Sequence, residues 1–388
     1  MTVAESDAPS PTPPATLREL AWLFGKLGFT AFGGPSAHIA MMEDEVVRRR
    51  RWMTRERFLD LLGATNLIPG PNSTELAIHI GHDQARWRGL IVAGVCFIVP
   101  AVAIVTAIAW SYVRFGALPQ FMGVMYGIKP VIIAVVIQAL WGLGKSAVKT
   151  PFLAVVGAAA VAATVVGVNE LLVLAGAGVM VASGRGVGAR VASSWVPLPL
   201  LGAGATSATT AASFGLWPLL LFFLKVGSVL FGSGYVLLAF LRSDLVEHLH
   251  WLTESQLLDA VTVGQVTPGP VFTTATFIGY ILGGAAGAGV ATIGIFLPAF
   301  LFVAVSGPLV PRLRRSKIAG AVLDGVNVAS LALMAVVTVQ LGRAAIIDVP
   351  TAILAGAAAV VLIRYRLNAA WLVLAGAVVG AVVTYALW

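Results

Sequence analysis

The sequence contains Pro-Gly-Pro twice, at residues 69–71 and 268–270, each time inside a hydrophobic region. A proline disfavours helical backbone in the residue before it, so the first proline of each motif should end a helix. Glycine tolerates the turn that must follow, and the second proline suits the first position of a new helix. The N–H groups that begin this helix are unpaired and carry partial positive charge, which favours an anion. The predicted helix-breaking residues are Pro69, Pro71, Pro268 and Pro270.

Polar side chains on both sides of the turns could complete a site for an oxyanion, because amide and hydroxyl groups donate hydrogen bonds. At the first turn, we also expect the N–H groups of Asn72, Ser73 and Thr74 to point at one spot. The alternative is that each motif only kinks a helix. Broken helices at matching positions of two halves favour a transporter's binding site. The candidate ligands at the turns are Asn66, Gly70, Asn72, Ser73, Thr74, Gln265, Gly269 and Thr273.

Lysines interrupt apolar segments at equivalent places. Lys26 lies in the middle of residues 17–33, and Lys225 lies within residues 216–240. A lysine can extend its amine to the membrane surface, but this is difficult from mid-segment and would have to happen twice. Cations buried in membranes are costly and usually functional, so we predict that both lysines bind an anion. Lys129 could line the same cavity or lie near the outer interface.

A glycine-rich stretch follows each of the two equivalent lysines, at residues 32–36 and 231–234. Glycines here suit close packing of helices. They equally suit backbone N–H groups that approach an anion, and both interpretations stay open. The candidate ligands in these stretches are Gly33, Gly34, Ser36, Gly232 and Ser233.

Groups that could carry protons near the first turn are not repeated near the second. Glu75 is the better candidate because it lies one helical turn past Pro71, and His38 is the other. For each of the histidines His38, His79 and His82, a position at the membrane interface is slightly favoured over a proton relay. The corresponding residues of the second half are Leu237, Thr274, Phe277 and Tyr280.

The composition is that of a helical membrane protein. Of 388 residues, 59% are hydrophobic and 11% are charged, whereas soluble proteins carry roughly 25% charged residues. The net charge of +8 is typical of basic cytoplasmic loops rather than of nucleic-acid binding. Cys96 is the single cysteine, which excludes intrachain disulfides. The sequence contains no P-loop, nucleophile elbow or zinc-protease motif, so we predict no enzyme and no cofactor.

The chain is one duplication, because adding 199 to a residue number of the first half reaches a similar residue of the second, as with Lys26 and Lys225. We therefore expect a disordered tail over residues 1–16 and a first repeat over 17–183. A linker rich in small residues follows at 184–216, and the second repeat covers 217–388.

The basic loops do not repeat with the sequence, which indicates that the halves are inverted in the membrane. Residues 48–57 are rich in arginine and their second-half counterpart is not, whereas residues 312–317 are basic in the second half only. Lys and Arg mark the cytoplasmic side. Residues 48–57 and 82–88 are both basic, so the segment between them should enter the membrane and return. The predicted fold is an all-α polytopic membrane protein with inverted halves, each of about five spans plus a re-entrant helix pair broken at Pro-Gly-Pro.

These motifs resemble the chromate ion transporter family in its long-chain, two-domain form. The resemblance covers about residues 17–388 and rests on residues 26–38, the arginines before Trp52, residues 69–73 and the second-half version from Lys225 to Pro270. It implies gradient-driven export of chromate through the bacterial inner membrane by a multi-pass protein, and chromate resistance. Gly234 and Val271–Phe272 depart from the first-half pattern, so the halves should contribute unequally to the site.

Two other functions compete with chromate export. One is uptake of sulfate or another oxyanion, because nothing in composition or spacing distinguishes chromate from sulfate. The other is an intramembrane enzyme that acts on an anionic lipid head group, with Glu75 and a histidine as acid and base. The lack of a matched carboxylate or metal cluster argues against the enzyme. The expected partners are chromate, with sulfate as the alternative, and the lipid bilayer; a homodimer stays open.

Overall fold

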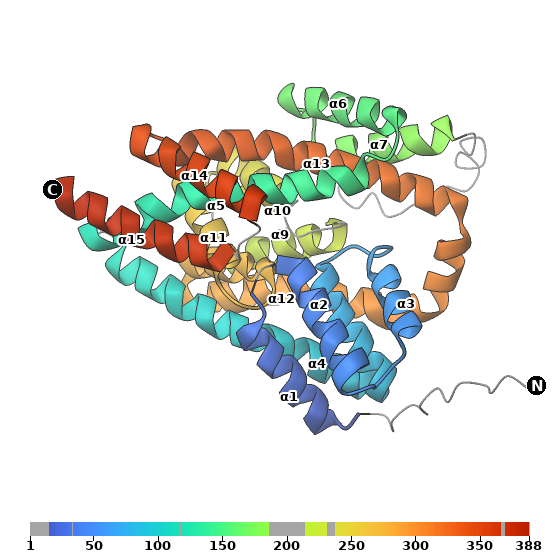
Figure 1. Cartoon of the computed structure of the whole chain (residues 1–388). Helices are drawn as coiled ribbons and strands as arrows, with labels where there is room; N and C mark the ends of the chain where they lie inside the picture. The colour runs from blue at the N-terminus through green and yellow to red at the C-terminus, as the bar shows by residue number, and fades with distance from the viewer. Residues whose placement is uncertain are drawn as a thin grey trace, which may run out of the picture.

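The computed structural model describes residues 15–32, 34–116, 118–185, 214–230, 237–365 and 369–387, and these residues form helices and connecting turns (Figure 1). Gly33, Gly232 and Ser233, three of the predicted ligands, lie outside the described residues, as do residues 1–14 and 186–213 of the predicted tail and linker. Thr16, predicted to belong to the tail, instead caps the first helix: its hydroxyl accepts from the N–H of Glu19.

The elements of the two halves follow in the same order. The first half contains α1 (Leu17–Thr30), α2 (Gly34–Glu43), the π-helical segment η1 (Asp44–Arg49), α3 (Arg55–Thr65), α4 (Asn72–Phe115), α5 (Pro119–Ala147), α6 (Pro151–Val165) and α7 (Glu170–Gly184). The second half contains α9 (Leu216–Val229), α10 (Leu237–Leu241), η3 (Arg242–His248), α11 (Glu254–Val266), η4 (Val271–Thr273), α12 (Thr274–Arg315), α13 (Lys317–Ala345), α14 (Val349–Tyr365) and α15 (Ala369–Leu387).

Each Pro-Gly-Pro motif separates two helices. α3 ends at Thr65 and α4 begins at Asn72, while α11 ends at Val266 and the next helical turn begins at Val271. The central glycines have φ of 141° and 87°, a backbone conformation that a residue with a Cβ rarely adopts. The turn geometry therefore depends on glycine at both positions.

The long helices α4 and α12 each fold back on themselves. The backbone leaves the helical conformation at Ala85–Arg86 in α4 and at Gly283–Gly284 in α12. Beyond the break the two arms touch: a Cβ on Gly81 would overlap the backbone of Gly89, and the second half repeats this contact between Gly279 and Gly287. Each is thus a helical hairpin.

The two halves are interlocked by an exchange of helix contacts. Helix α5 of the first half packs against α14 and α15 of the second, and α13 packs against α6 and α7 (Figure 1). Because α5, α6 and α7 correspond to α13, α14 and α15 in the duplication, the two sets of contacts are equivalent. Such an exchange is the arrangement that an approximate two-fold axis between the halves produces.

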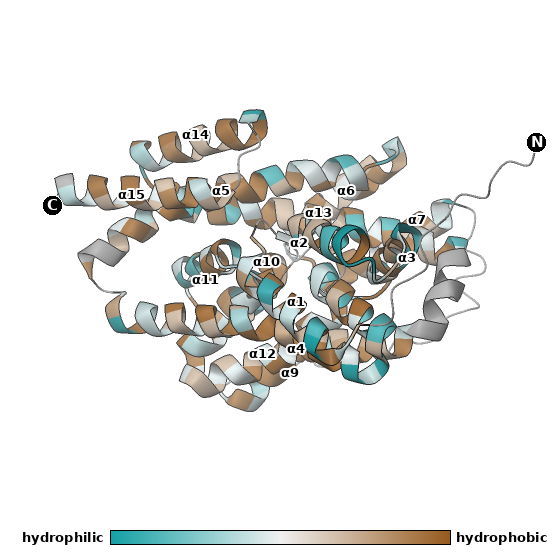
Figure 2. Ribbon diagram, turned by 60° about the horizontal axis from the view of Figure 1, so that its bottom comes forward, coloured by the Kyte–Doolittle hydropathy of each residue, from teal (hydrophilic) through white to brown (hydrophobic). Residues whose placement is uncertain are grey.

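The helices carry the apolar surface that a bilayer requires. Four of them are long and apolar enough to cross a membrane, within Asn72–Phe115, Met122–Ala147, Val271–Ser306 and Lys317–Ala345. Figure 2 shows hydrophobic residues along α12 and α14, whereas hydrophilic residues concentrate around α2 and α3. Large apolar side chains such as Trp22, Trp110 and Trp371 are exposed on this surface.

Candidate functional site

The two Pro-Gly-Pro turns cross between the halves. The N–H of Gly70 donates to the carbonyl of Leu230 at 2.6 Å, and the N–H of Gly269 donates to the carbonyl of Ala31 at 2.9 Å. Leu230 and Ala31 are the residues that end the opening helices α9 and α1. Each turn therefore docks on the opening helix of the opposite half, and both turns lie at the interface between the halves.

The start of α4 presents fewer free donors than the sequence predicts. The N–H of Thr74 donates to the carbonyl of Pro71 at 2.8 Å, so the prediction that it points freely at an anion is wrong. The helix tightens in its first turn, which is a common way to satisfy such groups. The N–H groups of Asn72 and Ser73 have no backbone acceptor among the described residues, and they are the donors left for a ligand.

His38 of α2 joins the opening helix to the first turn of α4. Its Nε2 lies 3.0 Å from the carbonyl of Ala31, and its Nδ1 lies 3.3 Å from the hydroxyl of Ser73. A carbonyl only accepts, so Nε2 carries the hydrogen and Nδ1 of the neutral ring accepts from Ser73. His38 is 1% exposed, and the second half has the buried Leu237 at its place.

The side chain of Glu75 fills the inside of the first turn. It is fully buried, and neither carboxyl oxygen has a hydrogen-bond partner within the described chain. The side chain bends back toward the turn, since a Cβ on Gly70 would overlap its Oε1. The hydroxyl of Thr74 and Nε2 of His79 are buried and unpartnered in the same way. The first turn is therefore polar and incompletely satisfied.

The second turn satisfies the hydroxyl groups of its two threonines. Thr273 donates to the carbonyl of Pro270 and Thr274 to that of Val271, both at 2.8 Å. Phe272, at the place of Ser73, is buried. The side-chain nitrogen of Gln265 is the one unpartnered buried group near this turn in the described structure.

Two amides bridge the first turn. The side-chain nitrogen of Asn72 donates to the side-chain oxygen of Asn66 at 2.9 Å, and that of Asn66 donates to the carbonyl of Leu62 at 3.2 Å. Both predicted ligands thus hold the turn. Ser36 is exposed on α2, whereas Gly34 begins that helix with φ of 77°.

The two equivalent lysines are paired and partly exposed, which corrects the expectation that they are buried cations. Lys26 lies 3.0 Å from Glu45, and Lys225 lies 2.7 Å from Asp244. Their side chains are 45% and 42% exposed. The acids at 45 and 244 are also 199 residues apart, a signal that could have predicted both ion pairs.

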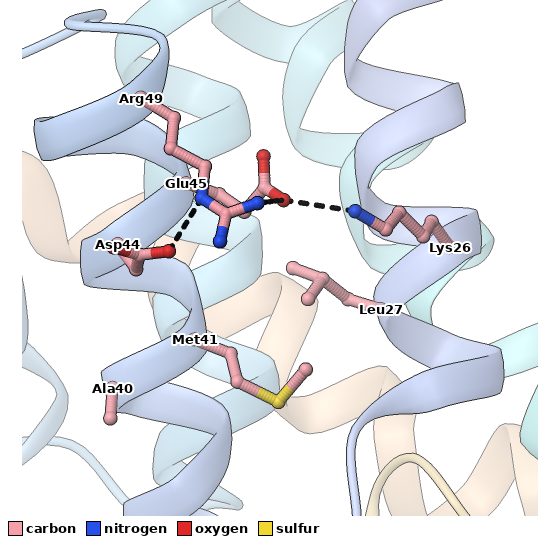
Figure 3. Close-up of a pocket in the computed structure, with 7 residues that line it drawn as sticks. All are labelled: Lys26, Leu27, Ala40, Met41, Asp44, Glu45 and Arg49. Atoms are coloured by element: carbon pink, nitrogen blue, oxygen red, sulfur yellow. Dashed lines mark hydrogen bonds and ion pairs between the residues drawn. The ribbon is translucent and has the colours of Figure 1, made fainter.

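Lys26 and Glu45 line a cavity of about 340 Å³ between α1 and the α2–η1 segment (Figure 3). Partial burial acts to raise the pKa of the Glu45 carboxyl, but hydrogen bonds from Lys26 and Arg50 outweigh it, and the pKa lies below its usual range. The acid is thus held as a carboxylate beside Lys26. The full lining is Lys26, Leu27, Ala40, Met41, Asp44, Glu45 and Arg49.

Lys129 belongs to an ion pair that crosses the halves. Its amine lies 2.9 Å from Asp259 of α11 and donates to Ser255 at 2.8 Å. The hydroxyl of Tyr112 in α4 donates to the same acid at 2.9 Å. Asp259 is 4% exposed. Asp259 is the equivalent of Asp60 in the duplication, which the sequence shows. The sequence does not show that Asp259 contacts Lys129.

The model of the chromate transporter family matches residues 18–182 and again residues 217–381. The chain belongs to the chromate transporter family. Two matches within one chain fit a fold of two repeats. Together with the apolar helices, they identify a multi-pass membrane protein.

Named relatives cover most of the chain. The chromate transport protein of Cupriavidus metallidurans is 34% identical over 386 residues, which is 97% of this chain and 95% of the relative. The probable chromate transport protein of Synechococcus elongatus is 31% identical, over 87% of this chain and 88% of the relative. The chromate transport protein of Pseudomonas aeruginosa is 30% identical, over 87% of this chain and 84% of the relative. No solved structure matches the chain.

Proposed function

We propose that this member of the chromate transporter family exports chromate across the bacterial inner membrane as a secondary transporter and thereby confers chromate resistance. The observation that carries the proposal is the crossing of the two Pro-Gly-Pro turns at the interface between the halves. Helix starts that meet at a repeat interface are how such transporters hold anionic groups. The names of the relatives support chromate as the substrate.

The proposed site lies at the start of α4. The N–H groups of Asn72 and Ser73, the hydroxyl of Thr74 and the positive end of the helix would bind the oxyanion. Lys26 and Lys225 enter this site as cations that exchange an acidic partner for the anion. Among the other predicted ligands, Asn66, Gly70, Gly269 and Thr273 shape the two turns. Gly34 begins α2, Ser36 is exposed on that helix, and Gln265 has an unpartnered amide nitrogen, while Gly33, Gly232 and Ser233 lie outside the described chain.

The membrane potential is sufficient to drive the proposed export. An interior-negative potential favours the outward movement of a negative charge by roughly 2.3 kcal/mol per charge and 100 mV. A dianion therefore leaves the cell downhill without ATP, which agrees with a sequence that contains no nucleotide-binding motif.

The proposed topology has inverted halves and a re-entrant pair made of α3 and the first arm of α4. The ion pair of Arg57 with Asp83 at 2.6 Å supports the re-entrant arrangement, because it joins the ends of the two helices that lie away from the Pro-Gly-Pro turn. Single cysteines at Arg48 and its equivalent Glu247, both exposed, should react from opposite sides of the membrane in a Cys96→Ser background. A cysteine at Arg88 should react from the side of Arg48, and reaction from the other side would exclude the re-entrant pair.

The test of function is flux in proteoliposomes that contain the purified protein. An imposed potential should drive chromate toward the positive side, and protein-free liposomes are the control. Sulfate added in excess should slow chromate if the site takes both oxyanions. Absence of chromate flux under any potential, from protein that is monodisperse and correctly inserted, would refute the proposal.

A further inference from the structure

The acid inside the first turn has no hydrogen bond or ion pair within the described chain to stabilise its charge. Glu75 is fully buried, and its two oxygens have no partner in the described chain. An apolar cluster lies beside the turn, formed by Ile68, Ile78, Leu90, Ala299 and Val303. An isolated carboxylate in such a place is too costly to persist, and the group takes up a proton instead.

The charged groups on the neighbouring elements do not compensate Glu75. The described part of α12 that packs on the turn has no charged residue from Thr274 to Ser306. His38 on α2 is engaged with Ala31 and Ser73, and Lys225 on α9 is paired with Asp244. On α3, Arg57 is paired with Asp83 at the outer end. On α1, which packs against the same arm of α4, Lys26 is paired with Glu45. The other titratable groups on α3 and on the first arm of α4 are Arg55, which is paired with Glu43, and Glu56, Asp60, His79 and His82.

We propose that Glu75 is a proton-binding site linked to the oxyanion site, so that a protonated carboxyl and the oxyanion occupy the first turn together, and the proton is released on the far side with the oxyanion. This inference rests on the proposed transport function. It follows from the position of the carboxyl against Gly70, in the turn that precedes the N–H groups of Asn72 and Ser73. An ionised carboxylate there repels a dianion, whereas the neutral acid donates a hydrogen bond to it.

A row of histidines gives the proton a route to the surface. His79 follows Glu75 by four residues and His82 follows His79 by three, so all three lie on one face of the first arm of α4. His79 is 7% exposed and its Nε2 is unpartnered within the described residues. His82 lies at the outer end against Trp87. The second half has Phe277 and Tyr280 at the histidine places and Thr274 at the acid, so the route exists once.

The linked proton changes the charge that moves with each oxyanion. A dianion alone carries two negative charges, and with one proton it carries one net negative charge. The potential still favours export of that complex, although less steeply, and an acidic outside favours uptake. At equilibrium, one coupled proton changes the accumulation ratio about tenfold for each unit of pH gradient.

The experiment compares the whole protein with Glu75→Gln in proteoliposomes, with chromate as the probe. One series applies a pH gradient at alkaline values, where chromate remains a dianion, with the potential clamped at zero. The other applies a potential at equal pH. Wild-type protein should accumulate chromate on the more alkaline side of the membrane. Glu75→Gln should lose this response, and the potential dependence of its remaining flux should correspond to two negative charges for each chromate instead of one.

Matched variants separate the role of the acid from a general defect. Glu56→Gln makes the same change in the first turn of α3, where the side chain is exposed, and should behave as wild type. Glu75→Asp keeps an acid and should keep the pH response. An unchanged pH response in Glu75→Gln, or wild-type accumulation on the acidic side, would overturn the inference. Wild-type protein without potential-driven flux would instead refute the transport function.

Discussion

The two Pro-Gly-Pro turns share a backbone and differ in chemistry. Both place glycine at positive φ and both donate an N–H to the end of the opposite opening helix. The first turn contains a buried, unpartnered acid and a histidine bonded to its serine. The second turn satisfies its threonines internally and replaces that serine by Phe272. The comparison indicates that the duplication preserved the scaffold at the interface, whereas the buried polar groups without partners gather at the first turn.

The shared backbone is tested by adding a methyl group at each central glycine, the change with the largest expected effect. Gly70→Ala should abolish transport, because the Cβ overlaps Glu75 and the φ of 141° is strained for alanine. Gly269→Ala should also impair it severely, since its Cβ would lie 2.7 Å from that of Ala101. Pro71→Ala is the mild control. Chromate flux and folded yield are the measurements, and normal flux in Gly70→Ala would place the anion elsewhere.

The difference at His38 is tested by exchanging the residues of the two halves. His38→Leu removes the link between Ala31 and Ser73 and should weaken chromate binding by about 1–2 kcal/mol, the worth of one or two buried hydrogen bonds. Leu237→His should lower stability instead, because the buried ring would have no designed partner. Binding and thermal unfolding of both variants check this. Equal loss of affinity in both would remove the proposed asymmetry.

A smaller difference is expected between the hydroxyls of the two turns. Ser73→Ala should weaken chromate binding by about 1 kcal/mol, because the hydrogen bond that holds His38 against the first turn of α4 is lost. Thr273→Ala should leave affinity unchanged, because that hydroxyl is bonded to the carbonyl of Pro270. The chromate affinities of both variants, measured by competition with sulfate, test this difference. The asymmetry is wrong if Thr273→Ala has the larger effect.

Substitution of the equivalent lysines Lys26 and Lys225 should have similar effects in the two halves. Lys26→Ala and Lys225→Ala should reduce chromate flux by similar factors, since both lysines form the same contact with an acid. The effect on stability should be below about 1 kcal/mol, as for other exposed ion pairs. Glu45→Gln is the control: it frees Lys26 and should not reduce flux. If Glu45→Gln reduces flux as much as Lys26→Ala, the ion pair itself is what matters.

The features that depend on residue type could be predicted from the sequence. The hydrogen bonds between main-chain atoms of distant segments could not. Composition and apolar segments indicated the helices, and each Pro-Gly-Pro motif indicated a place where one helix ends and another begins. The bonds from Gly70 to Leu230 and from Gly269 to Ala31 join backbone atoms of different halves, so no side chain marks them. The fold-back of α12 at Gly283–Gly284 has a glycine signal, but its partner at Ala85–Arg86 has none.

The lysines show a different limit of the sequence. Their positions within apolar segments suggested burial, because the sequence does not reveal which face of a short helix is covered. Glu45 and Asp244 repeat at the same offset as the lysines, so the pairing was present as a pattern. It became evident only once α1 and η1 were seen side by side.

The reciprocal docking of the turns also bears on the ancestry of the chain. A turn that needs the opening helix of another copy could not have been completed by a single repeat alone, so the ancestral repeat must have worked as a pair. If the halves are inverted, that pair required one polypeptide to insert in both orientations. Fusion into one gene removed the constraint that the copies be identical. A residue such as Glu75 could then arise in one copy without being imposed on the other.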